Sequence, residues 1–320
     1  MLEGLIQETY EEGQLLGMLP ITVINSKSLL YNRESTLPSA AFYDIHEQIP
    51  WTAEVTVSQQ EATLRTIARQ SILDDFIQKT YKDPNDYKTI VLSTLRKGCM
   101  RTIEDKLIYG NNASDGAEFD GVGRMLPADI AGGEAWAAAN LQAYDMGGAS
   151  APVTLKVMRE LIDAVRPKPS ILLMTRTMRN TLSATAYEKG IVLSNATSQG
   201  TTHPPSDFGK RVDFFDGVPV VISDYLLDET DNTVDKDSAG TSGMSSIWAL
   251  RFGSLIDGGL SLCIGGDTGR VDLFTMKELD TLEDYIAGGI RLYAFACLAQ
   301  GSSRATAVIH SIDEDGVIVG

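Results

Sequence analysis

The sequence predicts an α+β fold for this chain of 320 residues, and three patterns indicate it. An apolar stripe of helical period runs through residues 83–109. Two strand-like segments within residues 21–69 flank a long polar stretch and predict an extended hairpin. Helix and strand patterns alternate after residue 150, and the C-terminal part is rich in strand-like runs.

The N-terminal segment, residues 1–19, is predicted to form a short amphipathic arm that ends at Pro20. Its apolar face is too small to fold alone, so we expect it to lie on another part of the structure. The following hairpin should pair strands at residues 21–24 and 51–57. Its middle, about residues 28–50, has no core of its own, and such a projection is either disordered or ordered by a neighbouring molecule.

The longest helix is predicted at residues 83–109. Asp83 can act as its N-cap, and Pro84 stands at the first helical position, where its missing N–H costs nothing. The apolar residues recur every four positions, with three more widening the stripe: Tyr87, Val91, Leu95, Cys99, Ile103 and Leu107, then Ile90, Met100 and Ile108. Gly110 supplies the stop. At about 1.5 Å per residue the helix would be roughly 40 Å long, a structural spine.

An α/β unit follows the glycine-rich stretch at residues 110–150. Thr154 can cap a helix that ends before Pro167, and residues 170–174 form a continuous apolar run typical of a buried strand. A second helix is expected at residues 178–188, and Asp216-Gly217 predicts a tight hairpin turn. Polar loops are expected at residues 194–210 and 228–243, and further strands at residues 246–252, 290–298 and 305–312.

The chain is strongly acidic, with 27 Lys and Arg against 43 Asp and Glu and a net charge of −16. This balance argues against a surface that grips nucleic acid, which requires clustered Lys and Arg. No apolar run is long enough to cross a bilayer, and the acidic residues before position 13 do not suit a signal peptide. The three cysteines are widely spaced and resemble neither a disulfide framework nor a zinc site, which favours production in the cytoplasm.

Sequence motifs for chemistry are weak throughout, and we predict no catalytic, cofactor-binding or metal-binding residues. Residues 265–270 resemble a phosphate-binding loop but lack its lysine, so a plain turn is favoured. Residues 235–246 imitate the start of a calcium loop, but Ala239 and Ser246 replace expected ligands, which favours a solvated loop. His310 lies in a strand-like segment and is interpreted as structural. An α/β hydrolase or transferase in residues 131–269 is the enzymatic alternative.

Three stretches resemble the major capsid proteins of tailed bacteriophages, which have the Hong Kong 97-type fold. Residues 104–110 followed by 119–122 are similar to the end of that family's spine helix and its glycine loop. Residues 172–190 resemble its strand–helix–Lys-x-Gly unit, and residues 215–221 resemble its Gly-x-Pro-Val hairpin. Each stretch is short, but their order and spacing agree over nearly the whole chain.

The resemblance implies a division of the chain into five regions. Residues 1–24 would be an N-terminal arm and residues 25–70 an extended loop, the E-loop of this family. Residues 71–130, with the spine helix, would form a peripheral domain to which residues 270–320 return. Residues 131–269 would form an axial domain around the centre of each capsomer.

The resemblance also implies function and partners. Identical subunits would assemble into hexamers and pentamers of an icosahedral virion shell that encloses double-stranded DNA without specific binding. The protein would be made in the cytoplasm of a bacterial host and would act with a portal. No charged helical extension precedes the arm, so a separate scaffold protein is expected. Lys27 is the one lysine of the predicted E-loop and lies at its base, so we expect no covalent cross-links. An encapsulin shell around a protein cargo is the alternative with the same fold.

Overall fold

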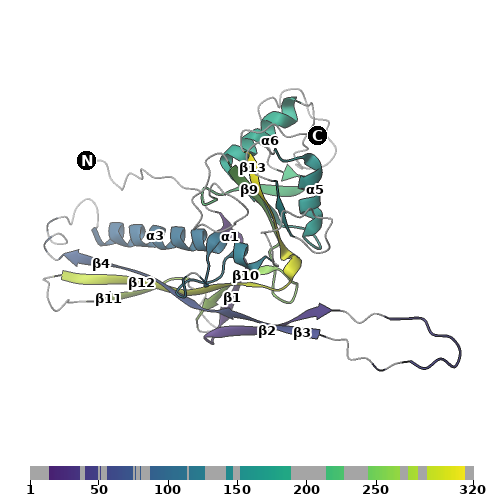
Figure 1. Ribbon diagram of the computed structural model, residues 1–320. Coiled ribbons are helices and arrows are strands. Elements are labelled where there is room, and N and C mark those ends of the chain that lie inside the picture. Colours follow the sequence, from purple (N-terminus) through teal and green to yellow (C-terminus); the bar gives the residue numbers. More distant parts are fainter. Residues whose placement is uncertain are drawn as a thin grey trace, which may run out of the picture.

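The computed structural model describes residues 14–36, 40–49, 51, 56–74, 76, 80, 87–113, 115–126, 142–146, 152–188, 214–226, 244–266, 273–279 and 287–313. These residues form two mixed sheets, the helices that cover them and a separate two-stranded hairpin that projects away from both sheets (Figure 1). The predicted α+β class is confirmed. No helix in the described ranges is long and apolar enough to span a bilayer.

The first sheet is built around one long strand. Its members are β1 (Ile21–Ile24), β4 (Arg65–Asp74), β10 (Leu260–Gly265), β11 (Thr275–Leu279) and β12 (Ala287–Gln300). The central strand β12 pairs with β4 over ten positions and with β10 and β11 over shorter stretches, in each case antiparallel. β1 adds to β10 in parallel.

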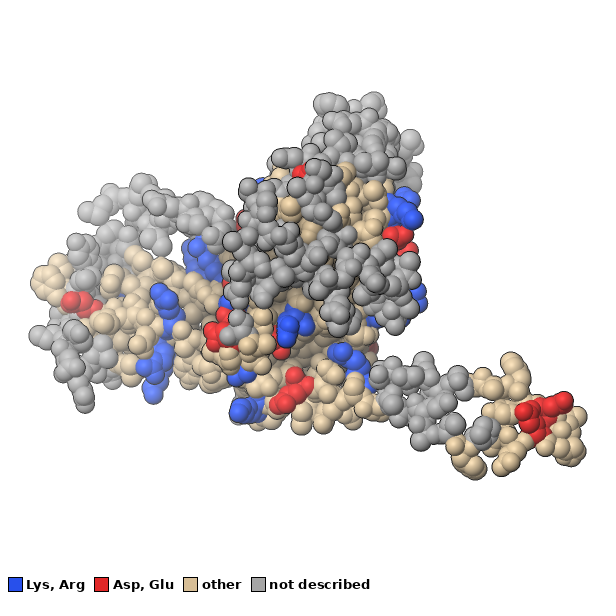
Figure 2. Space-filling model, in the orientation of Figure 1, with Lys and Arg blue, Asp and Glu red and all other residues tan. Residues whose placement is uncertain are grey.

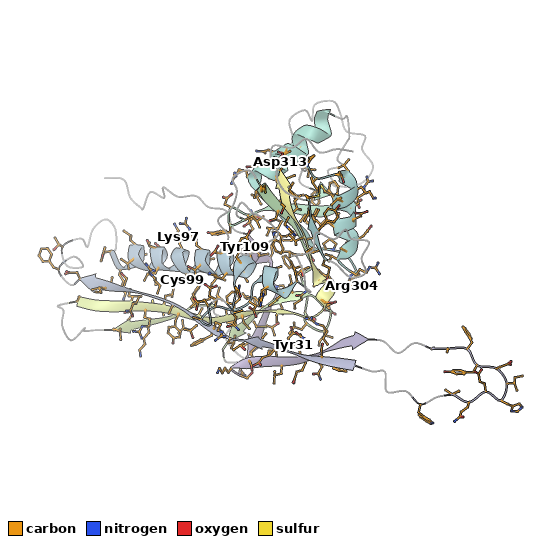
Figure 3. The ribbon with its side chains drawn as sticks, in the orientation of Figure 1. Tyr31, Lys97, Cys99, Tyr109, Arg304 and Asp313 are labelled. Atoms are coloured by element: carbon orange, nitrogen blue, oxygen red, sulfur yellow. The ribbon has the colours of Figure 1, made fainter. Side chains whose placement is uncertain are left out.

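A long helix, α3 (Tyr87–Tyr109), lies along this sheet (Figure 1). The predicted stripe is confirmed at its buried positions, which are Leu95, Cys99, Ile103, Leu107 and Ile108. Cys99 is on the side that faces the sheet, whereas Lys97 points the other way (Figure 3). Met100 was expected to widen the stripe, but it is exposed because it lies one position beyond the contact face. The predicted caps Asp83 and Pro84 lie outside the described residues.

The second sheet has the strand order β5-β13-β9-β6-β8-β7. Its strands are β5 (Ala143–Asp145), β6 (Ile171–Met174), β7 (Phe214–Phe215), β8 (Val218–Ile222), β9 (Met244–Leu250) and β13 (Thr306–Asp313). Every residue of β6 and β9 is buried, because one face packs on helix α5 (Leu155–Ala164) and the other on the core shared with the first sheet. Burial on both faces explains the continuous apolar runs of the sequence.

The local signals expected in this region are confirmed. The Thr154 hydroxyl accepts a hydrogen bond from the N–H of Val157 and caps α5, as expected. The helix predicted at residues 178–188 is α6 (Arg176–Glu188). Asp216 and Gly217 have φ of 50° and 72°, the left-handed pair that a type I′ turn between β7 and β8 requires.

The predicted pairing of residues 21–24 with 51–57 is wrong. The hairpin consists of β2 (Ser28–Thr36) and β3 (Thr56–Thr63), paired antiparallel, whereas residues 21–24 form β1 and pair with β10. β2 lies inside the stretch expected to be the polar middle of the hairpin. The partner of β1 is distant in sequence, so alternation within residues 21–57 could not reveal it.

Three short helical segments complete the described chain: α1 (Leu15–Met18), α4 (Val122–Met125) and a 3₁₀ turn at Ser303–Ala305. The C-terminal part of the chain contributes strands to both sheets. β10 pairs in the first sheet although it precedes residue 269, and β13 pairs in the second although it follows residue 270. The chain therefore crosses between the two sheets more than once after β9.

Candidate assembly surfaces

The end of the β2–β3 hairpin carries apolar side chains that touch little else in the chain. Phe42 and Trp51 are fully exposed, Ile45 is 85% exposed, and Ile49 and Tyr43 are also exposed. Isolated exposed apolar residues are common on soluble proteins, but a group of large ones at the end of a projection marks an interaction site. Residues 40–49 and Trp51, the hairpin tip, therefore form a candidate contact surface (Figures 1 and 2).

The hairpin tip has a fixed turn at its end. The N–H of Asp44 donates to a Glu47 carboxylate oxygen at 2.9 Å, and the N–H of Glu47 donates to the Asp44 carbonyl at 3.1 Å. His46, between them, has a φ of 72°, in the left-handed region. Figure 2 shows the two acids together at the end of the projection. The tip thus presents apolar side chains beside a pair of carboxylates.

The base of the hairpin is held firmly to the first sheet. The hydroxyl of Tyr31 donates to the carbonyl of Gln300 at 2.8 Å, and the Arg33 guanidinium donates to the carbonyls of Gln300 and Gly301. Burial raises the pKa of Tyr31, so its hydroxyl stays protonated as a donor. Tyr31 is placed at this junction in Figure 3. Since the base is anchored and the tip is not, the hairpin is positioned to reach another molecule.

The start of the described chain packs on α3. Leu15, Leu16 and Leu19 are buried in the main core, and the N–H of Leu16 donates to a Glu104 carboxylate oxygen at 2.9 Å. Glu104 itself is only 5% exposed. Burial raises the pKa of this carboxyl, and the backbone N–H groups of α1 oppose the shift. The expectation that the arm lies on another part of the structure is confirmed for residues 14–19; residues 1–13 lie outside the described ranges.

The end of α3 is closed by a compact loop, within the first stretch that resembled capsid proteins. The N–H of Gly121 donates to the carbonyl of Gly110 at 2.8 Å, and the N–H of Gly110 donates to the carbonyl of Lys106 at 2.9 Å. Lys106 also forms an ion pair with Glu118. The loop fixes the path from α3 to α4 through backbone contacts that leave no room for side chains at either glycine.

Several strand edges are also open in the described part of the chain, and those of β1 and β4 are two of them. There β1 pairs only with β10, and β4 pairs only with β12, so each strand presents unpaired backbone groups along its other side. Such edges are a liability in a monomer because they can add a strand from another chain. In an assembly they are further possible contacts between subunits.

The residues considered for chemistry do not come together. His310 is buried in β13 beside the Ser311 hydroxyl, which agrees with a structural role, and His46 is at the hairpin tip. Within the described ranges no three His, Cys, Asp or Glu side chains are placed to hold a metal ion. Residues 267–270 and 235–243 of the two weak loop motifs, and His203, lie outside these ranges.

One open groove of about 510 Å³ lies between the turn after β1 and the end of β10. Ser26, Lys27, Thr66 and Phe295 line it, with no histidine, cysteine or carboxylate among its described lining residues. Among these described residues the groove therefore shows no pairing of a serine or cysteine with a histidine base. The sequence missed the apolar hairpin tip, although Phe42, Ile45 and Ile49 recur within the stretch interpreted as polar.

No family model matches the sequence, and no curated protein matches it either. Solved structures do match the fold over nearly the whole chain. The SrpI encapsulin complex of Synechococcus elongatus PCC 7942 superposes with a TM-score of 0.64 at 15% identity, covering 96% of this chain and 89% of that one. The capsid of a native GTA particle gives 0.61 at 13% identity, covering 98% and 96%.

The capsid of cyanophage P-SCSP1u also matches, with a TM-score of 0.57 at 10% identity, covering 97% of this chain and 91% of that one. At such low identity the likeness concerns the fold, and each alignment covers nearly the full length of this chain. The resemblance inferred from three short sequence stretches is thereby confirmed at the level of the fold. The chain has the Hong Kong 97-type fold of phage capsid and encapsulin shell subunits.

Proposed function

We propose that this protein is a structural shell subunit, the major capsid protein of a tailed bacteriophage. Identical copies would assemble into hexamers and pentamers of an icosahedral head that encloses double-stranded DNA. The observation that carries the proposal is the anchored hairpin whose apolar tip is exposed, in a fold similar to capsid subunits along nearly its full length. The tip of this projection stays exposed in a single subunit, whereas in a lattice it can be buried against a neighbouring subunit.

Burial of the hairpin tip on a neighbouring subunit would supply the driving force for assembly. Each large apolar side chain that becomes buried contributes about 1.5–3 kcal/mol. The contact is heterologous, because the tip of one copy meets a different surface of the next, and heterologous contacts generate rings and closed shells. Many such contacts per shell would add to a stable particle.

The proposal keeps the division into regions that was expected from the sequence. Residues 25–70 would be the E-loop, residues 71–130 with α3 the peripheral domain, and residues 131–269 the axial domain. The strand pairing refines the scheme: β10 joins the sheet under α3, and β13 joins the sheet beside α5. A separate scaffold protein and a portal would be its partners, and the virion its final location.

The net charge of −16 fits a wall around packed DNA. An acidic subunit repels phosphates, so DNA would move freely along the inner surface during packaging. Tight binding of assembled shells to DNA at low salt, with a steep dependence on salt concentration, would contradict this part of the proposal.

An encapsulin shell is the second candidate, and the similarity to the Synechococcus encapsulin favours it. Both candidates share the fold and the need for contacts between subunits. They differ in what the shell encloses, so the contents of purified particles separate them. Nucleic acid with nearby terminase and portal genes supports the phage, and a packaged enzyme supports the encapsulin.

Assembly of hairpin-tip variants tests the proposal. We expect the double substitution Ile45→Ser and Trp51→Ser to leave the folded subunit intact, because neither side chain is buried in it. Loss of two interface side chains should raise the concentration needed for assembly by about tenfold or more. Size-exclusion chromatography with light scattering measures assembly, and circular dichroism measures folding.

The matched control is Gln48→Ser, which changes an exposed polar residue of the same tip. It should assemble like the wild type. Normal assembly of the double variant would refute the role of the tip, and loss of folding would show that the tip belongs to the subunit's own core.

A further inference from the structure

Two of the three cysteines lie opposite each other on neighbouring strands of the first sheet. Cys263 of β10 and Cys297 of β12 are direct partners in the antiparallel register. Both are buried, with at most 1% of either side chain exposed, and both belong to the main core. Cys99 is buried in a different cluster, between α3 and the sheet.

The register places the two thiols within reach of a disulfide. Directly opposed residues of antiparallel strands have Cα atoms about 4.5–5.5 Å apart and side chains on the same face of the sheet. Disulfides span Cα separations of about 4.4–6.8 Å. The Cα separation expected from the register of Cys263 and Cys297 therefore lies within the range that a disulfide spans. The spacing along the chain gave no hint of this, because the two residues meet only through strand pairing.

The two thiols are also chemically unequal. A hydrogen bond from the Cys297 thiol lowers the pKa of Cys263, and the same interaction together with burial raises the pKa of Cys297. Burial of Cys263 opposes this effect, because it raises the pKa of the thiol. Thiolates are the reactive form of cysteine, so Cys263 is the nucleophile of the pair and Cys297 its resolving partner.

We propose that Cys263 and Cys297 form a redox-responsive pair that closes into an intrasubunit disulfide when the protein meets a peroxide. The Cys263 thiolate attacks one oxygen of hydrogen peroxide, the O–O bond breaks, and Cys263 becomes a sulfenic acid as hydroxide leaves and takes up a proton. The sulfur of Cys297 then attacks the sulfenic sulfur, loses its proton and releases water. Two thiols are oxidised, one peroxide is reduced, and two waters form.

The disulfide would link β10 covalently to β12 and close the chain between residues 263 and 297 into a loop. β1 pairs with β10, and the hairpin base bonds to Gln300 at the end of β12, so the bond would tie together the strands that support both. Restricting the unfolded chain in this way should raise the thermal midpoint of unfolding by about 5–10 °C. A shell that leaves a reducing cytoplasm would thereby gain stability.

The test uses the full chain, reduced, freed of reductant and treated with hydrogen peroxide. Peptide mapping without reduction should find Cys263 linked to Cys297, and thiol titration after denaturation should find Cys99 alone still free. In the folded protein the link should join Cys263 to Cys297 alone, whereas protein held unfolded in denaturant should also give links to Cys99. The Cys99→Ser variant should behave like the wild type, and Cys297→Ser should leave Cys263 as sulfenic or further oxidised acid.

Three results would overturn the proposal: thiols that resist peroxide in the folded protein, oxidation of all three cysteines to acids without a link, or links between subunits. The peptide map of the unsubstituted chain decides between these results, even if a variant fails to fold. The outcome does not depend on whether the protein assembles into a shell, so it is separate from the proposed function.

Discussion

Gly110 and Gly121 fix the end of α3 through their lack of side chains. A Cβ atom on Gly121 would lie 2.7 Å from the Gly110 nitrogen, 2.7 Å from the Lys106 oxygen and 2.8 Å from the Ile108 oxygen. All three are backbone atoms at the end of the helix, so they cannot move aside without opening it. A Cβ on Gly110 would likewise collide with the carbonyls of Phe119 and Lys106.

Replacing Gly121 with Ala should therefore destabilise the subunit. We expect the free energy of unfolding to fall by about 1–3 kcal/mol, the usual cost of forcing extra atoms into a packed site. Gly116→Ala is the control in the same loop, because nothing lies within 4 Å of its added Cβ, and it should be neutral. Denaturant unfolding measures both. Equal stability of the two variants would show that the contact between the glycines is not what closes the loop.

Among the elements, the contact between α1 and α3 includes one buried carboxyl group beside its apolar side chains. Glu104 accepts the N–H of Leu16, and burial raises the pKa of the carboxyl above its ordinary value. A folded pKa above the unfolded one means that the native state holds its proton more tightly. Stability from this group is fully present below the unfolded pKa of about 4.3 and is lost as the pH rises through the folded value.

The substitution Glu104→Gln removes this ionisation while keeping a carbonyl that can accept the Leu16 N–H. The variant should lack the fall in stability that the wild type shows between a pH of about 4.3 and the raised pKa of Glu104. Urea unfolding at a series of pH values measures the slope, whatever the absolute stability of the variant. Glu61→Gln, at an exposed position of β3, should keep the wild-type profile. If Glu104→Gln and the wild type showed the same dependence of stability on pH, the raised pKa would not belong to Glu104.

Elements that depend on local signals could be predicted from the sequence. The stripe of α3, the Thr154 cap and the Asp216-Gly217 turn each involve neighbouring residues, and each is confirmed. Elements that depend on distant partners could not. β1 pairs with β10, which was not predicted as a strand, so its partner was assigned wrongly within the hairpin.

The role of the hairpin tip in function could not be predicted from the sequence either. The sequence indicated a projection without a core, but Phe42 and Ile45 were hidden in a stretch of mostly polar composition. Their importance comes from exposure, which only the three-dimensional arrangement reveals. The opposed cysteines were likewise invisible, because spacing along a chain does not determine strand register.

At the scale of the whole molecule, the acidic net charge, the open strand edges and the projecting hairpin all fit the proposed shell subunit. One hydrophobic core joins the first sheet, α3 and one face of the second sheet into a single block, and a second core lies between the second sheet and α5. The hairpin extends from this block and exposes apolar surface that a second copy could cover (Figures 1 and 2). A block with a projecting contact suits a repeating lattice better than a solitary protein.

Electron microscopy of the purified protein, alone and together with the proposed scaffold and portal proteins, tests the proposed shell function most directly. We predict closed shells built of hexamers and pentamers, with residues 40–49 and Trp51 of each subunit covered by a neighbour. Only monomers under every condition, with no shells, rings or capsomers, would contradict the shell function. Shells in which these residues face solvent would contradict the role assigned to the hairpin.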